Sequence, residues 1–148
     1  MKRAVVLVLV ALAATAEPTA RFSERAGEEL DGIFADLQAL NKSTRQALET
    51  EGANTQALLS EAQIALMILD CRATTLGSDH AASRAHRLLS DIICCERQYY
   101  GDVAALTEYR LEGNVAMMTL VNARAKTLLE TVILSLVDEY LWARKCHW

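Results

Sequence analysis

The sequence Ile92-Ile93-Cys94-Cys95-Glu96-Arg97 places two of the four cysteines of this 148-residue chain side by side. Adjacent cysteines rarely bond to each other, because the ring they would close strains the peptide between them. On a helix their side chains diverge by about 100°, so each reaches in a different direction. We therefore predict that one bonds to Cys71 and the other to Cys146. Two pairings stay open: Cys71–Cys94 with Cys95–Cys146, and Cys71–Cys95 with Cys94–Cys146.

The amino-terminal end has the pattern of a secretory signal peptide. Two basic residues follow Met1, an apolar run extends from Ala4 to Ala14, and position 16 is again a small residue. The run is shorter than the roughly 20 residues that span a bilayer, so we predict cleavage after Ala16 rather than a membrane anchor. Secretion agrees with the cysteines, because disulfides persist in oxidising compartments. We expect a signal peptide over residues 1–16 and a single extracellular domain over residues 17–148.

The composition of the predicted mature chain indicates one helical domain. It has 132 residues (148 minus 16), which suits a single core. Removing Lys2 and Arg3 from the 15 basic residues leaves 13 against 19 acidic ones, a formal charge of −6. No run of Lys or Arg occurs, so we expect no nucleic-acid partner. Pro18 is the only proline, and Ala, Leu and Glu are abundant, which is typical of an all-α fold.

Breaks in the apolar pattern divide the chain into four to five helices. The breaks fall at Gly52, Gly77-Ser78-Asp79, Tyr99-Tyr100-Gly101-Asp102 and Gly113-Asn114. Residues 58–69 are apolar nearly all round, a pattern typical of a buried helix. We predict a compact bundle around this central apolar helix, stapled by two disulfides.

The predicted staple constrains where the central helix ends. If the helix continued to Leu76 and turned tightly, Cys71 would be level with roughly residue 85 of the next helix. Cys94 would then lie about 13 Å farther along, whereas a disulfide needs Cα atoms within about 7 Å. We therefore expect the helix to end close to Cys71, with the following residues extended, or the two helices to cross steeply.

Patterns of catalytic and metal-binding residues are missing from the sequence. The three histidines are His80, His86 and His147, and the first two lie about 240° apart around a helix. Since the cysteines are assigned to disulfides, we expect no metal site and no cofactor. The chain has no Gly-rich phosphate loop, Gly-x-Ser-x-Gly elbow or His-Glu-x-x-His pair, and we expect no enzyme activity.

Charged and aromatic side chains on and beside the third predicted helix are our candidates for binding a protein partner. Arginines offer charged anchors, and tyrosines often carry binding energy at interfaces. The candidates are Arg84, Arg87, Arg97, Tyr99 and Tyr100.

Two further patterns indicate other roles. Asn41-Lys42-Ser43 is an Asn-x-Ser sequon, so Asn41 is a candidate glycosylation site. Met67, Met117 and Met118 favour an alternative function, a helical carrier of a small hydrophobic ligand, because methionine adapts to irregular apolar surfaces. The mark of a carrier would be a cavity between the central helix and Met118.

The chain resembles the anophensin and albicin family of salivary proteins from blood-feeding anopheline mosquitoes. The resemblance is carried by the signal peptide, the helical pattern, Cys71, the Cys94-Cys95 doublet and the terminal Cys146-His147-Trp148. It covers essentially the whole mature chain, and it rests on organisation and cysteine layout rather than on a diagnostic motif. It implies a small secreted helical protein with two disulfides and no enzyme activity.

The resemblance also implies an anti-inflammatory role in blood feeding (haematophagy). The family is associated with blocking the alternative complement pathway at its convertase and with interference in kallikrein–kinin contact activation. We therefore expect a secreted salivary complement inhibitor that binds a host plasma protein complex and neither nucleic acid nor membrane. The alternatives are the hydrophobic-ligand carrier and a helical signalling ligand with a receptor of its own.

Overall fold

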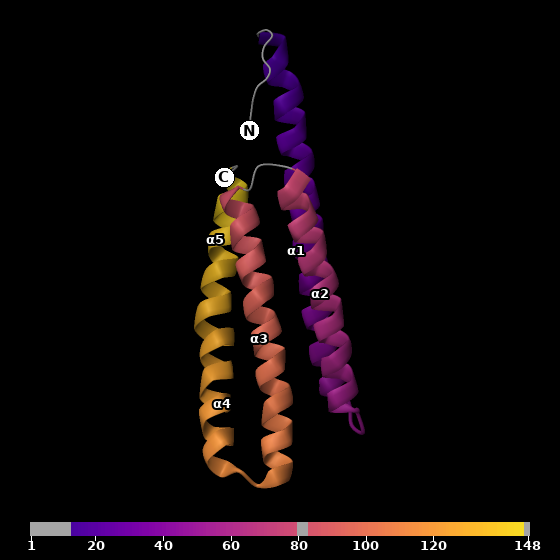
Figure 1. Ribbon diagram of the computed structural model, residues 1–148, viewed down its shortest axis with the longest axis vertical. Helices are drawn as coiled ribbons and strands as arrows, with labels where there is room; N and C mark the ends of the chain where they lie inside the picture. Colours follow the sequence, from indigo (N-terminus) through magenta and orange to yellow (C-terminus); the bar gives the residue numbers. More distant parts are fainter. Residues whose placement is uncertain (1–12, 80–82, 147–148) are drawn as a thin grey trace.

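The chain forms an all-α bundle of four helical rods in a computed structural model that describes residues 13–79 and 83–146 (Figure 1). Side chains are described from Glu24 to Gly77 and from Ser83 to Cys146. The first three rods are α1 (Ala13–Leu48), α2 (Thr55–Asp79) and α3 (Arg84–Glu112). The fourth rod consists of α4 (Val115–Thr127), a π-helical segment η1 (Leu128–Ile133) and α5 (Leu134–Lys145). The prediction of an all-α chain is confirmed.

The turns between the rods follow from glycine and asparagine chemistry. Gly113 takes the left-handed conformation, with φ 72°, and caps the carboxyl end of α3. Asn114 then caps α4, since its Oδ1 accepts a hydrogen bond from the Met117 amide at 3.2 Å. Gly52, with φ 78°, and Asn54 make the corresponding break before α2. Both breaks were expected from the sequence.

Two other helix boundaries differ from expectation. α2 continues to Asp79, and the cap of α3 is Ser83, whose hydroxyl accepts a hydrogen bond from the His86 amide at 3.1 Å. α3 also continues through Gly101 to Glu112 instead of ending near Tyr99. Gly101 lies close to α2, because a Cβ added there would be 3.5 Å from the Gln63 amide nitrogen.

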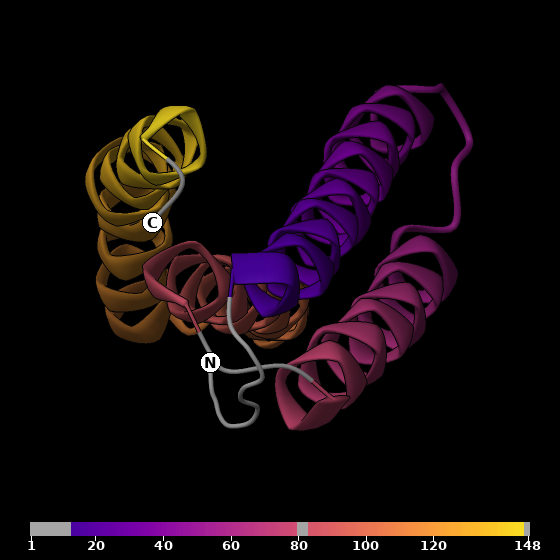
Figure 2. The same cartoon turned by 90° about the horizontal axis from the view of Figure 1, so that it is seen from above.

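The centre of the bundle is α3. It packs against α1, α2, α4, η1 and α5, and the view from above places it between the α1–α2 pair and the fourth rod (Figure 2). Its buried positions recur along nearly two thirds of its length: Ala85, Leu88, Leu89, Ile92, Ile93, Glu96, Tyr100 and Asp102.

The prediction that residues 58–69 form the central helix is therefore wrong. Among the described helices, α2 packs mainly on α1 and α3. Its buried side chains are Leu59, Ala62, Leu66, Leu69, Ala73 and Leu76. On its other side Ile64, Met67 and Ile68 are 59%, 51% and 58% exposed. No helix of the described part of the chain covers this surplus of apolar side chains, so α2 lies at the edge of the bundle.

The predicted disulfides are also absent, since all four cysteines are free and far apart. The ion pairs Arg84–Glu139 and Asp102–Arg124 fix the register of α3 against the fourth rod. In this register the Cys94-Cys95 doublet is level with roughly residues 128–132, and Cys146 lies about 21–27 Å farther along. That separation greatly exceeds the roughly 7 Å that a disulfide allows between Cα atoms.

Cys71 fails to meet the doublet for a different reason. The ion pair between Asp70 and Arg97, 3.3 Å, places Cys71 at nearly the same height as the doublet. However, Leu69 and Ala73 are buried, and a residue midway between them points to the opposite side of the helix. Cys71 is accordingly exposed on the outer side of α2, so the expected staple between α2 and α3 does not form.

The predicted signal peptide, residues 1–16, lies mostly outside the described residues, which begin with α1 at Ala13. Among the described helices, none combines the length and the apolar character needed to cross a membrane.

Candidate functional site

A groove of about 700 Å³ runs along the outer side of α2, where this helix lies beside α1. α1 contributes Glu29, Gly32 and Ile33 to it. α2 contributes Ile64, Met67, Ile68, Cys71, Arg72, Thr75 and Leu76. Ile33 and Leu76 are buried and form the floor, whereas most of the α2 side chains are exposed.

The α2 wall of the groove is a regular helical stripe. Ile64, Ile68 and Thr75 recur with Met67 and Cys71 at spacings of three and four residues, which brings them onto one face. Three large apolar side chains in this stripe are more than half exposed. Contiguous exposed apolar surface of this kind marks interaction sites more often than scattered single residues do.

The lining of the groove contains two charged side chains, Arg72 and Glu29. Arg72 reaches across to Asp36 on α1, with Nη1 to Oδ2 at 2.6 Å, so the positive charge in the lining is paired. Glu29 is exposed near the Thr75 end and has no ion pair with any residue that the structure describes. Gly32 leaves the α1 wall open, because a Cβ there would meet nothing within 4 Å.

The arginines proposed from the sequence do not form one surface. Arg84 pairs with Glu139 on α5 at 3.1 Å, while Arg97 pairs with Asp70 on α2 at 3.3 Å. α5 and α2 flank α3 on different sides (Figure 2), so these two arginines point apart. Arg87 is exposed and also has an interaction partner. The structure thus gives Arg84 and Arg97 roles in holding neighbouring helices.

The two candidate tyrosines belong to the interior of the bundle. Tyr100 is buried and donates a hydrogen bond to Asn41 Oδ1 at 2.8 Å, while Tyr99 is half-buried and lies edge-on against it. The Asn41 amide nitrogen donates in turn to the buried Glu96 carboxylate at 3.0 Å. Burial raises the pKa of Glu96 to about 7 and that of Tyr100 to about 12.

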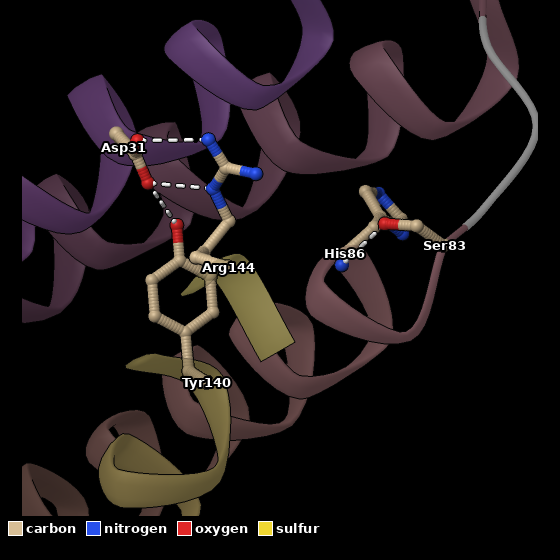
Figure 3. A network of polar contacts seen from close by, with 5 residues as sticks. All are labelled: Asp31, Ser83, His86, Tyr140 and Arg144. Carbon is tan, nitrogen blue, oxygen red and sulfur yellow. Dashed lines mark hydrogen bonds and ion pairs between the residues drawn. The ribbon is translucent and has the colours of Figure 1, made fainter. Parts of the chain in front are cut away.

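A second polar cluster joins α1 to α5 (Figure 3). Asp31 on α1 accepts two hydrogen bonds from the Arg144 guanidinium, at 2.8 and 3.0 Å, and one from the Tyr140 hydroxyl at 3.0 Å. The hydrogen bonds from Arg144 hold the pKa of Asp31 below its usual value, and burial raises the pKa of Tyr140. The Tyr140 ring stacks on Phe34, with centroids 4.7 Å apart. This cluster fixes α5 against α1 and presents no open site.

Asp102 and His86 also have structural partners. The buried Asp102 carboxylate accepts hydrogen bonds from Arg124 at 2.6 and 3.0 Å, and this pairing raises the pKa of Arg124. His86 Nε2 lies 2.6 Å from the Ala73 carbonyl oxygen. Within residues 13–79 and 83–146, no three His, Cys, Asp or Glu side chains come together as a metal site. His80 and His147 lie outside the described residues.

Comparisons with known proteins add no relative from which a site could be transferred. The chain matches no protein-family model, no curated protein and no solved structure.

Sequence reasoning missed the groove although its signal was visible. Residues 58–69 are apolar on more sides than two neighbouring helices can cover, and this excess was interpreted as burial. Met67 does line the groove, as a carrier would require, but Met117 and Met118 are half-buried on α4 and are not part of it. The groove thus lies between α1 and α2, away from Met118, whose neighbourhood would be the mark of a carrier.

Proposed function

We propose that this chain is a secreted, non-enzymatic protein that acts by binding a protein partner through its α1–α2 face. The observation that carries the proposal is the exposed stripe of Ile64, Met67 and Ile68 beside a groove. Apolar side chains that are exposed together gain free energy when a partner removes them from water. Secretion is supported by the signal-peptide pattern of residues 1–16.

The family resemblance supplies the first target, which is the convertase of the alternative complement pathway. Blocking an assembled complex requires only surface complementarity, and a helical bundle with an apolar groove offers that. The cysteine layout contributes less support than the sequence implied, because the four cysteines are free. Contact activation of the kallikrein–kinin system is the second target to test.

A carrier of a small hydrophobic ligand is the other candidate, and the groove volume favours it. About 700 Å³ lies within the range of small-molecule sites. Such sites usually bury most of the ligand surface, however, whereas the largest apolar side chains of this groove are more than half exposed. An open apolar wall fits a protein surface better than it fits a small ligand.

The test is lysis of erythrocytes in human serum through the alternative pathway, with the classical pathway run in parallel. The purified chain without residues 1–16 should reduce alternative-pathway lysis selectively at submicromolar concentration. The Ile64→Ser/Ile68→Ser variant should lose this effect, because it removes the apolar stripe. The matched control is Leu134→Ser/Leu141→Ser, which changes two side chains of similar exposure, 57% and 51%, on α5.

Full inhibition by the Ile64→Ser/Ile68→Ser variant would contradict the assignment of the binding surface. No effect of the wild-type chain on either complement pathway, or on kallikrein activation, would contradict both targets. A hydrophobic molecule retained through purification and seen by native mass spectrometry would favour the carrier instead.

A further inference from the structure

We propose that the occupant of the α1–α2 groove is an amphipathic helix of the partner protein, with basic side chains at one end of its apolar stripe. This inference rests on the proposed function and adds the chemistry of the partner. It is drawn from the length of the groove, its side-chain spacing and its charges.

The dimensions of the groove suit a helix of about three turns. Along α2 the lining extends from Ile64 to Leu76, and these twelve steps rise by about 18 Å. A helix of that length presents three or four apolar side chains at spacings of three and four residues, the pattern by which helices bind in grooves.

The walls of the groove can accept the ridges of such a helix. On α2, Ile64 and Ile68 are four residues apart, as are Met67 and Cys71, so their side chains form two short parallel ridges. On α1, Gly32 leaves space between these ridges and the opposite wall, because a Cβ there would have no neighbour within 4 Å. Met67 can adjust to the partner because its side chain is flexible.

The charges along the groove favour a partner helix with basic side chains at one end. Arg72 is already paired with Asp36, so the middle of the groove has little net charge. Near the Thr75 end, Glu29 is exposed and forms no ion pair with any residue that the structure describes, and its neighbour Glu28 on α1 is also exposed. A Lys or Arg at that end of the partner helix would be attracted, whereas a carboxylate would be repelled. An exposed pair of this kind is worth about a two- to fivefold change in affinity.

The exposed thiol of Cys71 provides a direct readout of occupancy, because it lies in the lining of the groove. Cys94 is exposed on α3, is not part of the lining, and serves as an internal reference. The probe is a synthetic 14-residue helical peptide with four leucines spaced three or four residues apart and two lysines at its carboxyl end. Two control peptides accompany it. One carries two glutamates in place of the lysines, and the other contains the same residues as the probe in scrambled order.

The experiment measures the alkylation rates of Cys71 and Cys94 in the purified full-length mature chain, by mass spectrometry, with increasing peptide. We expect the lysine peptide to slow alkylation of Cys71 at least fivefold at saturation and to leave Cys94 unchanged. It should bind about two- to fivefold more tightly than the glutamate peptide, and Glu29→Gln should reduce this preference. Ile64→Ser/Ile68→Ser should abolish the protection.

Three results would overturn the inference. The first is no protection of Cys71 by the lysine peptide, and the second is equal protection by the scrambled peptide. The third is protection that grows with protein concentration without peptide, which would identify a second copy of the chain as the occupant. If serum inhibition persists in any of these cases, only the helix inference fails. If Cys71 is protected as expected but the chain does not inhibit lysis or kallikrein activation, only the proposed targets fail.

Discussion

Glu96 shows how a single residue can set the pH dependence of this fold. Its carboxyl is 5% exposed at the contact between α1 and α3, and its partner on α1 is the amide of Asn41. Burial raises the pKa to about 7, compared with 4.5 for a free side chain, and the hydrogen bond from Asn41 and the charge of Arg45 offset only part of this effect. The folded chain therefore binds the Glu96 proton more tightly than the unfolded chain does.

A glutamine at position 96 should remove the pH dependence of stability that Glu96 causes. The stabilising proton is fully present below pH 4.5 and is lost as the pH rises through 7, so ionised Glu96 weakens the fold above neutrality. We expect Glu96→Gln to raise the free energy of unfolding by about 2 kcal/mol at pH 8 and to change it little at pH 5. Urea denaturation at the two pH values measures this difference.

The matched control is Glu108→Gln, which neutralises an exposed carboxylate on the same helix. It should leave the free energy of unfolding within about 0.5 kcal/mol of wild type at both pH values. Equal stability of Glu96→Gln and wild type at pH 8 would show that Glu96 is not buried against Asn41.

The hydrogen-bond partners of single residues could not be predicted from the sequence. Asn41 is separated from Glu96 by 55 positions and from Tyr100 by 59, and nothing local to any of the three identifies the others. Their meeting depends on how α1 packs against α3. From the sequence we predicted a glycosylation site at Asn41 and a binding role for Tyr100, whereas the hydrogen bond that joins these two residues depends on the packing of α1 against α3.

At the scale of the elements, α2 has one buried face and one exposed face, and two consecutive residues show the difference. Leu66 is fully buried against the core and Met67 is 51% exposed. Leu66→Ala should lower the free energy of unfolding by about 2–5 kcal/mol, because it leaves a cavity in the packed core. Met67→Ala should change it by no more than about 0.5 kcal/mol. Denaturant unfolding of both variants tests which face of α2 is core; equal costs would mean that α2 is buried all round.

Gly32 in α1 and Gly113, which caps the carboxyl end of α3, should respond to alanine in opposite directions. Gly113 has φ 72°, where a side chain is strained, so Gly113→Ala should cost about 1–2 kcal/mol. Gly32 is helical and has open space around it, so Gly32→Ala should stabilise the chain by about 0.5–1 kcal/mol. Thermal unfolding of the two variants checks the signs, and destabilisation by both would contradict the backbone assigned to Gly32.

Elements with local signals were predictable and those with non-local causes were not. Two turns were predictable from short stretches of sequence, Gly52 with Asn54 and Gly113 with Asn114. The left-handed conformation and the side-chain cap are properties of a few consecutive residues. The position of α2 in the bundle depends on how many helices cover it, and hydrophobicity alone does not give that number. An all-round apolar pattern is therefore compatible with a buried helix and with an exposed interaction face.

The molecule as a whole is held by helix packing and cross-helix polar contacts rather than by disulfides. Asp31 with Arg144 joins α1 to α5, Asp102 with Arg124 joins α3 to α4, and Asp70 with Arg97 joins α2 to α3. In the helix register that these ion pairs fix, Cys146 lies far from the Cys94-Cys95 doublet. Cys71 lies on the exposed side of α2. A disulfide prediction from cysteine count needs this register, which the sequence did not provide.

The central claim is that the outer face of α2 is exposed surface with a free thiol, available to a partner. Alkylation of the native, unreduced chain, mapped by mass spectrometry, tests it most directly. We predict four free thiols, with Cys71 and Cys94 modified first. Cys95 and Cys146 should react more slowly because they are half-buried, and burial also raises the pKa of the Cys95 thiol. A disulfide-linked peptide joining any two cysteines, or a Cys71 as slow as Cys95, would contradict the account.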